Sequence, residues 1–320
     1  MKAYKAELAV FGASLLWGLN YCTVKIVLNY VPPMIAGTLR FLLAGLFILF
    51  ILKRVEGTIK LSRTLLLRVL LAGIVGFGLQ QVFFLYGSAL VDATMGALIT
   101  AFTTAVMTIV ASLLMREKLT GIMLGGILIA CAGMVMVVLG KGAMVALTAG
   151  SGLGILLLFI AGILNGLLPM LNKRTLERYS ALRVTTWTIF AGAFTLFPLG
   201  AADVQNVHWT GLPWVVWGSL FFTAVGATVL TNLLWNYGLT KVGVVRLTIY
   251  SYLPSIFGVL LAALLLRETL SSLQWLGAVL TLGGVLLSQL KHLDLKKLLL
   301  KKIWERKEPV RQRAVNDIAI

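Results

Sequence analysis

Long apolar segments are the feature that most limits how this chain can fold. The hydrocarbon core of a bilayer is about 30 Å thick, and an α-helix of roughly 20 apolar residues crosses it. Irregular backbone would leave unpaired amides in lipid, so each such segment must be helical. The sequence therefore predicts an all-α integral membrane protein with ten transmembrane helices, at residues 6–28, 34–52, 66–90, 93–115, 119–139, 153–172, 182–200, 212–238, 243–265 and 271–289.

The composition is that of a multi-pass protein of the cell membrane. Hydrophobic residues make up 59% of the chain and charged residues 12%, whereas charged residues approach a quarter of a soluble domain. Cys22 and Cys131 lie in apolar segments, and His208 and His292 are far apart. We therefore expect no disulfide, metal site or cofactor. The first apolar segment has no cleavage site of the secretory type, so it is expected to remain as a helix.

The positions of lysine and arginine predict the orientation. Cytoplasmic loops carry an excess of these residues. If the N-terminus is cytoplasmic, 24 of the 28 cations lie in cytoplasmic loops and termini, and only Lys141 and Arg267 lie outside. Both termini are therefore predicted to be cytoplasmic. The basic tail is expected to lie on the anionic cytoplasmic leaflet, and because the charge is confined to loops and tail, no nucleic-acid partner is expected.

The chain contains an internal repeat. LLMREKLTGIMLGGILIACAGMVMV (113–137) matches LLLRETLSSLQWLGAVLTLGGVLLS (264–288) at an offset of 151 residues. LLWGLNYCTVK (15–25) matches ILNGLLPMLNK (163–173) at an offset of 148. Each repeat holds five helices, an odd number, so the second should insert upside down. Inverted repeats are typical of alternating-access transporters, which bind substrate near the midplane between the halves.

These motifs resemble the EamA-type transporters of the drug/metabolite transporter superfamily. The resemblance rests on LLWGLNYCTVK followed by Pro32-Pro33 and Arg40-Phe41, and on the blocks LLMREKL and LLLRETL before glycine-rich helices. It implies that helices 1–4 and 6–9 surround a central cavity and that helices 5 and 10 lie at the periphery. The expected organisation is a first five-helix repeat, an external linker, a second repeat and a basic cytoplasmic tail, at residues 1–140, 141–152, 153–290 and 291–320.

Two cations, Lys25 and Arg40, fall inside predicted helices. A charge at bilayer depth costs several kcal/mol, about 2.5–3.5 even on insertion scales. Both residues are predicted to lie in the outer third of the membrane. Three interpretations remain open: the side chains reach the outer headgroups, they line a wet cavity and bind an anionic substrate group, or they form an ion pair, with Asp92 as the nearest carboxylate outside.

Carboxylates are absent from the middle of every predicted span. A proton-driven exporter of cationic drugs needs such a carboxylate, so we do not expect that mechanism. Glu117 and Glu268 each follow an arginine at a helix end. Their carboxylates suit the positive N-terminal ends of the fifth and tenth helices, and a role as a gate or coupling site is the alternative.

Polar and aromatic residues near the midplane complete the candidate site. Each could contact substrate or could form an interhelical hydrogen bond. Thr228 and Ser255 lie at similar depth. Pro169 and Pro254 are predicted to lie inside helices, where proline causes a kink that could act as a hinge. The candidate substrate-binding residues are Lys25, Arg40, Trp17, Asn20, Gln80, Gln81, Thr103, Asn165, Asn232 and Tyr252.

The leading interpretation is a carrier that exports a small organic metabolite, such as an amino acid, through a central cavity. An uptake carrier for a vitamin or a nucleotide-like metabolite is one alternative. A membrane-embedded enzyme acting on a lipid is another, but no cluster of histidine and acidic residues supports it. A receptor or scaffold is disfavoured by the inverted repeat.

Overall fold

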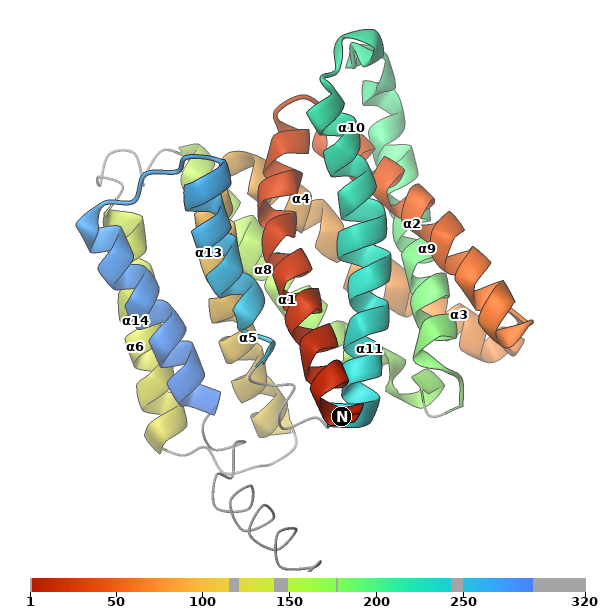
Figure 1. The fold of residues 1–320 in the computed structure, drawn as a ribbon, viewed down its shortest axis with the longest axis horizontal. Helices are drawn as coiled ribbons and strands as arrows, with labels where there is room; N and C mark the ends of the chain where they lie inside the picture. The colour runs from red at the N-terminus through yellow and green to blue at the C-terminus, as the bar shows by residue number, and fades with distance from the viewer. Residues whose placement is uncertain (1, 115–120, 141–148, 177, 243–249, 290–320) are drawn as a thin grey trace, which may run out of the picture.

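The structure, a computed structural model, describes residues 2–114, 121–140, 149–176, 178–242 and 250–289. The elements in these ranges are helices (Figure 1). The α-helices are α1 (Lys2–Leu28), α2 (Pro33–Glu56), α3 (Arg63–Gly73), α4 (Gln80–Leu90), α5 (Ala93–Leu114), α6 (Gly121–Leu139), α8 (Ala149–Leu176), α9 (Ala181–Gly200), α10 (Trp214–Phe221), α11 (Thr231–Val242), α13 (Leu253–Leu265) and α14 (Ser272–Gln289).

Two π-helices join α-helices into longer rods. The first, η1 (Ile74–Leu79), links α3 to α4, and the second, η4 (Phe222–Leu230), links α10 to α11. At the repeat offset of 151, η1 corresponds to residues 225–230, which lie inside η4. Two short 3₁₀ turns, η2 (Ala201–Asn206) and η3 (Trp209–Gly211), precede α10. The π-helix is rare and is often found at functional sites. Its presence in both repeats therefore makes these two rods candidates for a part in function.

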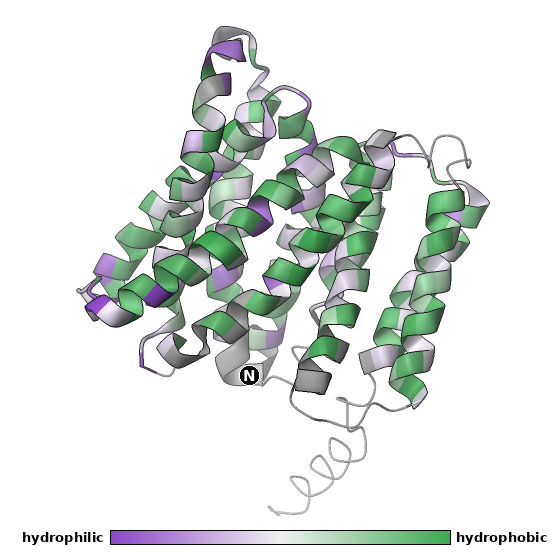
Figure 2. Cartoon of the chain, turned by 180° about the vertical axis from the view of Figure 1, so that it is seen from behind, coloured by the Kyte–Doolittle hydropathy of each residue, from purple (hydrophilic) through white to green (hydrophobic). Residues whose placement is uncertain are grey.

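The helices have the lengths and surfaces of a membrane protein. Seven described helical stretches are long and apolar enough to cross a membrane, and three shorter apolar helices lie beside them. Phe194, Leu264 and Leu128 are each at least 70% exposed, and Figure 2 shows hydrophobic residues along most of the helices. A side chain of this kind gains from contact with lipid rather than water. The chain is therefore a helical, multi-pass membrane protein.

One predicted helix differs from the structure. The ninth was expected at residues 243–265, but the described helix α13 begins at Leu253, after a turn at residues 251–252. Pro254 was predicted to lie in the interior of a helix. It lies instead in the first turn of α13. A proline is tolerated there because the N–H it lacks would have no partner within the helix. Residues 243–249 lie outside the described ranges.

Corresponding helices of the two repeats run in opposite directions. We call the end of the bundle that lies opposite the N-terminus the distal face. Lys25, near the end of α1, bonds to Val91 at this face. Gly154, near the start of α8, packs against the same residue. In the same way, the end of α9 at Gly200 packs against the start of α2. These opposed directions are those expected of the predicted inverted repeat.

Helices α6 and α14 form a pair at one edge of the bundle (Figure 1). Their backbones touch through glycines. A Cβ atom at Gly133 would lie 2.4 Å from the Thr281 amide nitrogen, and one at Gly284 would lie 2.4 Å from the amide nitrogen of Ala130. Small residues let membrane helices approach this closely. The pair packs mainly on α5 and leaves the centre of the bundle to the other helices.

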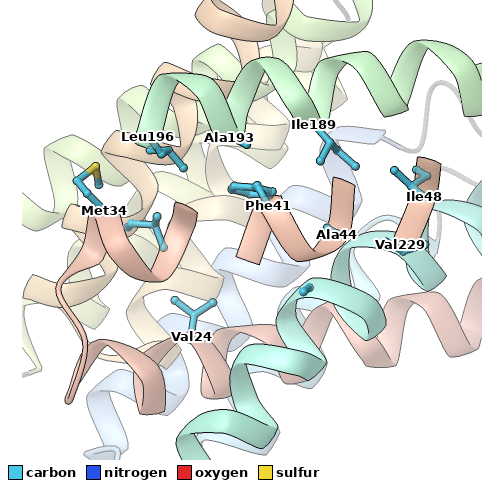
Figure 3. Packing of buried hydrophobic residues seen from close by; sticks show 11 residues of the cluster. Val24, Met34, Phe41, Ala44, Ile48, Ile189, Ala193, Leu196 and Val229 are labelled. Atoms are coloured by element: carbon cyan, nitrogen blue, oxygen red, sulfur yellow. The ribbon is translucent and has the colours of Figure 1, made fainter. Parts of the chain in front are cut away.

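Helix α2 packs on α9 through the largest apolar cluster. Phe41 and Leu196 are fully buried there. Figure 3 shows Ile189, Ala193 and Leu196 of α9 facing Phe41 of α2, with Val24 of α1 on the opposite side. This packing fixes α2 between the two repeats, and so it fixes the position of Arg40, the residue before Phe41.

Candidate functional site

Arg40 is a charged side chain buried in the bundle. It lies two turns into α2 and is 8% exposed. Its Nε donates to Thr228 Oγ1 at 3.0 Å, and its guanidinium carbon lies 5.1 Å from the centroid of the Phe41 ring. Its Nη1 is buried without a hydrogen-bond partner. A guanidinium stays protonated in proteins, so the described residues leave a buried positive charge only partly compensated.

The guanidinium borders a small cavity between the repeats. The free space within the cavity is about 10 Å³. That is room for about one water molecule, far less than the roughly 300–1,000 Å³ of a site for a drug-sized ligand, so the cavity must widen before it can hold a metabolite. Arg40 and Thr223 are its polar walls, and the other walls are apolar. Its lining residues come from α1, α2, α4, α10 and η4, namely Val24, Val27, Leu28, Ala36, Arg40, Leu85, Leu220 and Thr223.

The π-helix η4 holds the partner of Arg40. Thr228 is 4% exposed, and its hydroxyl donates to the Thr223 carbonyl at 2.8 Å, five residues back. Because that bond uses the hydroxyl proton, the oxygen lone pairs are left to accept from Arg40. The π register therefore orients the hydroxyl that holds the guanidinium in place.

Polar side chains continue one helical turn from the cavity. Asn20 and Gln81 are four residues before the lining residues Val24 and Leu85, hence on the same helix faces. The side-chain oxygens of Asn20, Gln80 and Gln81 are buried and have no hydrogen-bond partner within the part of the chain that the structure describes. A buried acceptor of this kind is costly unless something donates to it.

Trp17 contacts the second repeat at this depth. Its indole Nε1 donates to the Ala227 carbonyl at 3.1 Å, and its ring centroid lies 5.1 Å from that of Trp235. Asn232 lies nearby on α11 and donates from Nδ2 to the Thr228 carbonyl at 2.6 Å. Both side chains thus bind backbone beside Arg40's partner.

Lys25 is bonded to backbone. Its ammonium donates to the carbonyls of Ser88, Ala89 and Val91 at 3.2, 3.1 and 2.7 Å. These carbonyls belong to the end of α4, where a cation also interacts favourably with the helix dipole. Lys25 is not among the residues that line the Arg40 cavity. In this structure it caps a helix, and its role as a substrate ligand stays a prediction.

Three other candidates lie away from the Arg40 cavity. Thr103 bonds the carbonyls of its own helix and packs against Gly162 of α8. Tyr252 is 3% exposed, in a core cluster of α5, α6 and α14 residues. Asn165 is exposed on α8. Pro169 lies within α8, and its side chain is outside the described part.

The comparisons with known proteins show which family the chain belongs to. The EamA-like transporter family model matches residues 4–139 and 152–290. The chain belongs to the EamA-like transporter family. It is therefore a membrane transporter and not an enzyme, so the alternative of a lipid-modifying enzyme is wrong.

Proteins similar to this chain are named as transporters or efflux pumps. An uncharacterized transporter of Bacillus subtilis, YyaM, is 26% identical over 89% of this chain and 94% of that protein. A probable amino-acid metabolite efflux pump of Salmonella typhimurium is 25% identical over 84% of this chain and 89% of that protein. A crystal structure that is 19% identical superposes with a TM-score of 0.65 over 91% of this chain and 99% of that one, which supports the fold alone.

The sequence did not reveal the hydrogen-bond partners of the Glu268 carboxylate. Glu268 was expected to cap the helix that follows it, α14. Instead its carboxylate accepts from the amides of Ala93 and Thr94 at the start of α5. Helix α14 is capped by Ser271, whose side chain and amide exchange hydrogen bonds with Gln274. The spacing S-x-x-Q is a capping-box signal and could have identified this cap.

Proposed function

We propose that this chain exports a small organic metabolite that carries a carboxylate, an amino acid or a related compound. The substrate enters the cavity between the repeats when the cavity widens, and its carboxylate binds Arg40. Transport follows alternating access, in which the cavity opens first to one side of the membrane and then to the other.

The observation that supports this proposal is the Arg40 guanidinium with its unpaired Nη1. An uncompensated cation is expensive inside a membrane protein, and an anion in the cavity would offset that cost. Arginine binds a carboxylate through two parallel hydrogen bonds. Nε is already bonded to Thr228, and Nη1, which has no hydrogen-bond partner among the described residues, remains for a ligand.

The unpaired amide oxygens deeper in the bundle fit the same class of substrate. Asn20, Gln80 and Gln81 present buried acceptors, and an ammonium or amide group could donate to them. The apolar walls of the cavity suit an uncharged side chain. The names of the efflux-pump relatives in Salmonella typhimurium and Escherichia coli favour amino-acid metabolites and export.

A ligand screen tests the proposal directly. Purified protein is heated with sets of three related compounds. Each set contains an amino acid, its amide, which lacks the free carboxylate, and its decarboxylated amine. Compounds with a free carboxylate should raise the melting temperature of the wild type and leave that of Arg40→Gln unchanged. Compounds that do so are then tested for flux in proteoliposomes. Equal stabilisation by acid and amide would contradict the proposal.

A further inference from the structure

Two side chains of opposite charge hold the turn between α4 and α5 at the distal face. Lys25 donates to the Ser88, Ala89 and Val91 carbonyls at the end of α4. On the other side of the turn, Glu268 Oε1 accepts from the Ala93 amide at 2.9 Å and Oε2 from the Thr94 amide at 3.1 Å. Each charge thus meets the helix end of opposite dipole sign.

The two side chains come from different repeats. Lys25 lies on α1, in the same repeat as the turn, so it fixes the turn to its own half. Glu268 lies in the loop between α13 and α14 of the second repeat. Its two bonds therefore cross from one half of the molecule to the other, next to the place where α13 ends.

The backbone around Glu268 is shaped to present its carboxylate. Arg267 has a φ of 54°, and it is the only non-glycine residue with a positive φ in the described part of the chain. Such a conformation is unfavourable for a residue with a side chain and persists where the surroundings require it. It reverses the chain after α13, so that the Glu268 amide donates back to the Ala262 carbonyl at 3.3 Å.

We propose that Glu268 is a latch that closes the distal end of the transporter. The latch is made of its carboxylate and the first two amides of α5, and Lys25 keeps the turn in the position to receive it. This proposal rests on the proposed function, because alternating access requires the two repeats to separate at one face. Opening at the distal face then requires the two Glu268 bonds to break.

A native cysteine lies directly beneath the latch. Cys22 is fully buried, in a cluster with Ala93 and Ala262, and Leu266 packs against it. These neighbours are the two sides that the latch joins. When the latch opens, the thiol should become accessible to water, so its labelling rate reports on the opening. Cys131, on the peripheral helix α6, serves as an internal control.

The experiment measures the labelling of each cysteine by a charged, lipid-insoluble maleimide in nanodiscs, where both faces are accessible. Single-cysteine proteins are made with Cys131→Ser or Cys22→Ser. Glu268→Gln is nearly isosteric but carries no charge, so it weakens two charge-assisted bonds. Labelling of Cys22 should become faster by on the order of tenfold. Arg267→Gln, a neighbouring loss of charge at an exposed side chain, is the matched control and should change the rate less than twofold.

A second variant acts on the other side of the same bonds. Ala93→Pro removes one amide donor, and proline is favoured at the first position of a helix. It should accelerate Cys22 labelling in the same direction as Glu268→Gln, and it replaces that variant if the latter fails to fold.

Two outcomes would overturn the latch. One is a Cys22 rate that stays within twofold of wild type in both variants. The other is an equal acceleration at Cys131, which means that the whole fold has loosened. Neither outcome depends on transport or on Arg40. The labelling experiment can therefore support the latch when the ligand screen contradicts the proposed function, and it can contradict the latch when the screen supports that function.

Discussion

The two intramembrane cations have different surroundings. Lys25 has its charge compensated by three carbonyls at a helix end, whereas Arg40 has one hydroxyl partner and an unpaired nitrogen beside a cavity. The cost of burying a charge in the membrane is therefore no reason to expect a ligand at Lys25. At Arg40 it still favours one.

Arg40→Gln should weaken substrate binding by about 10- to 150-fold, the effect of losing a charged hydrogen bond of about 1.5–3 kcal/mol. Arg40→Lys keeps the charge but cannot form the two parallel hydrogen bonds. Its substrate affinity should lie between that of the wild type and that of Arg40→Gln. The measurement is the apparent affinity for flux in proteoliposomes at matched protein content. Arg54→Gln, at an exposed position on the same helix, is the control. An unchanged affinity in Arg40→Gln would show that the substrate does not bind there.

The sequence located both cations but could not distinguish them. Their depth follows from the apolar pattern, and their cost follows from their charge. Their partners do not follow, because the α4 carbonyls lie more than 60 residues away in the chain and the Thr228 hydroxyl 188 residues away. Only tertiary packing brings these groups together.

At the scale of the helix, the glycines of α6 fall into two classes. Gly121 and Gly125 have the G-x-x-x-G spacing that is typical of close helix contacts, but neither has any atom within 4 Å of an added Cβ. The close contact with α14 runs through Gly126 and Gly133 instead. Spacing along a helix shows that small residues share a face, and it does not show which face has a partner.

Gly133→Ala should therefore destabilise the protein by about 1–3 kcal/mol, because the new Cβ overlaps backbone atoms that cannot move independently. Its atoms would meet the Thr281 amide at 2.4 Å and the Gly277 carbonyl at 2.6 Å. Gly125→Ala meets nothing and should be neutral or stabilising by up to about 1 kcal/mol. Thermal unfolding in detergent measures both. If the two variants have the same melting temperature, α6 and α14 do not pack closely at Gly133.

Most helix boundaries could be predicted because hydrophobicity and length decide them. The π-helices could not, since their apolar pattern matches that of ordinary membrane helices. The turn at 251–252, which interrupts the helix predicted at 243–265, could not be predicted because nothing in hydropathy distinguishes it from a helix.

At the scale of the whole molecule, the orientation remains a prediction that rests on the distribution of cations. A reporter enzyme that is active only outside the cytoplasm should be inactive when fused after Ile320. The same reporter inserted after Asn206, in the distal segment before α10, should be active. The reverse pattern would place the distal face in the cytoplasm and reverse the predicted topology.

The opposed directions of α1 and α8, and of α2 and α9, agree with the odd number of helices that the internal match indicated. The sequence could suggest this symmetry because related segments keep their motifs. It could not show that Glu268 reaches across to α5, since the matched motif R-E-x-L fits a helix start equally well.

The wide turns of η1 and η4 have a consequence for how this bundle tolerates insertions and deletions. A π-turn holds one residue more than an α-turn, so it behaves as a single-residue insertion absorbed within a membrane helix. Deleting Gly226 should therefore let η4 rewind toward the α form while α10 and α11 keep nearly the same rotation relative to each other, because the lost residue is the one that the wide turn had absorbed. The cavity residues of this rod, Leu220 and Thr223, precede the deletion and should stay in place. The two π-helices are thus the positions in the membrane helices where the loss of one residue should reorient the fewest side chains.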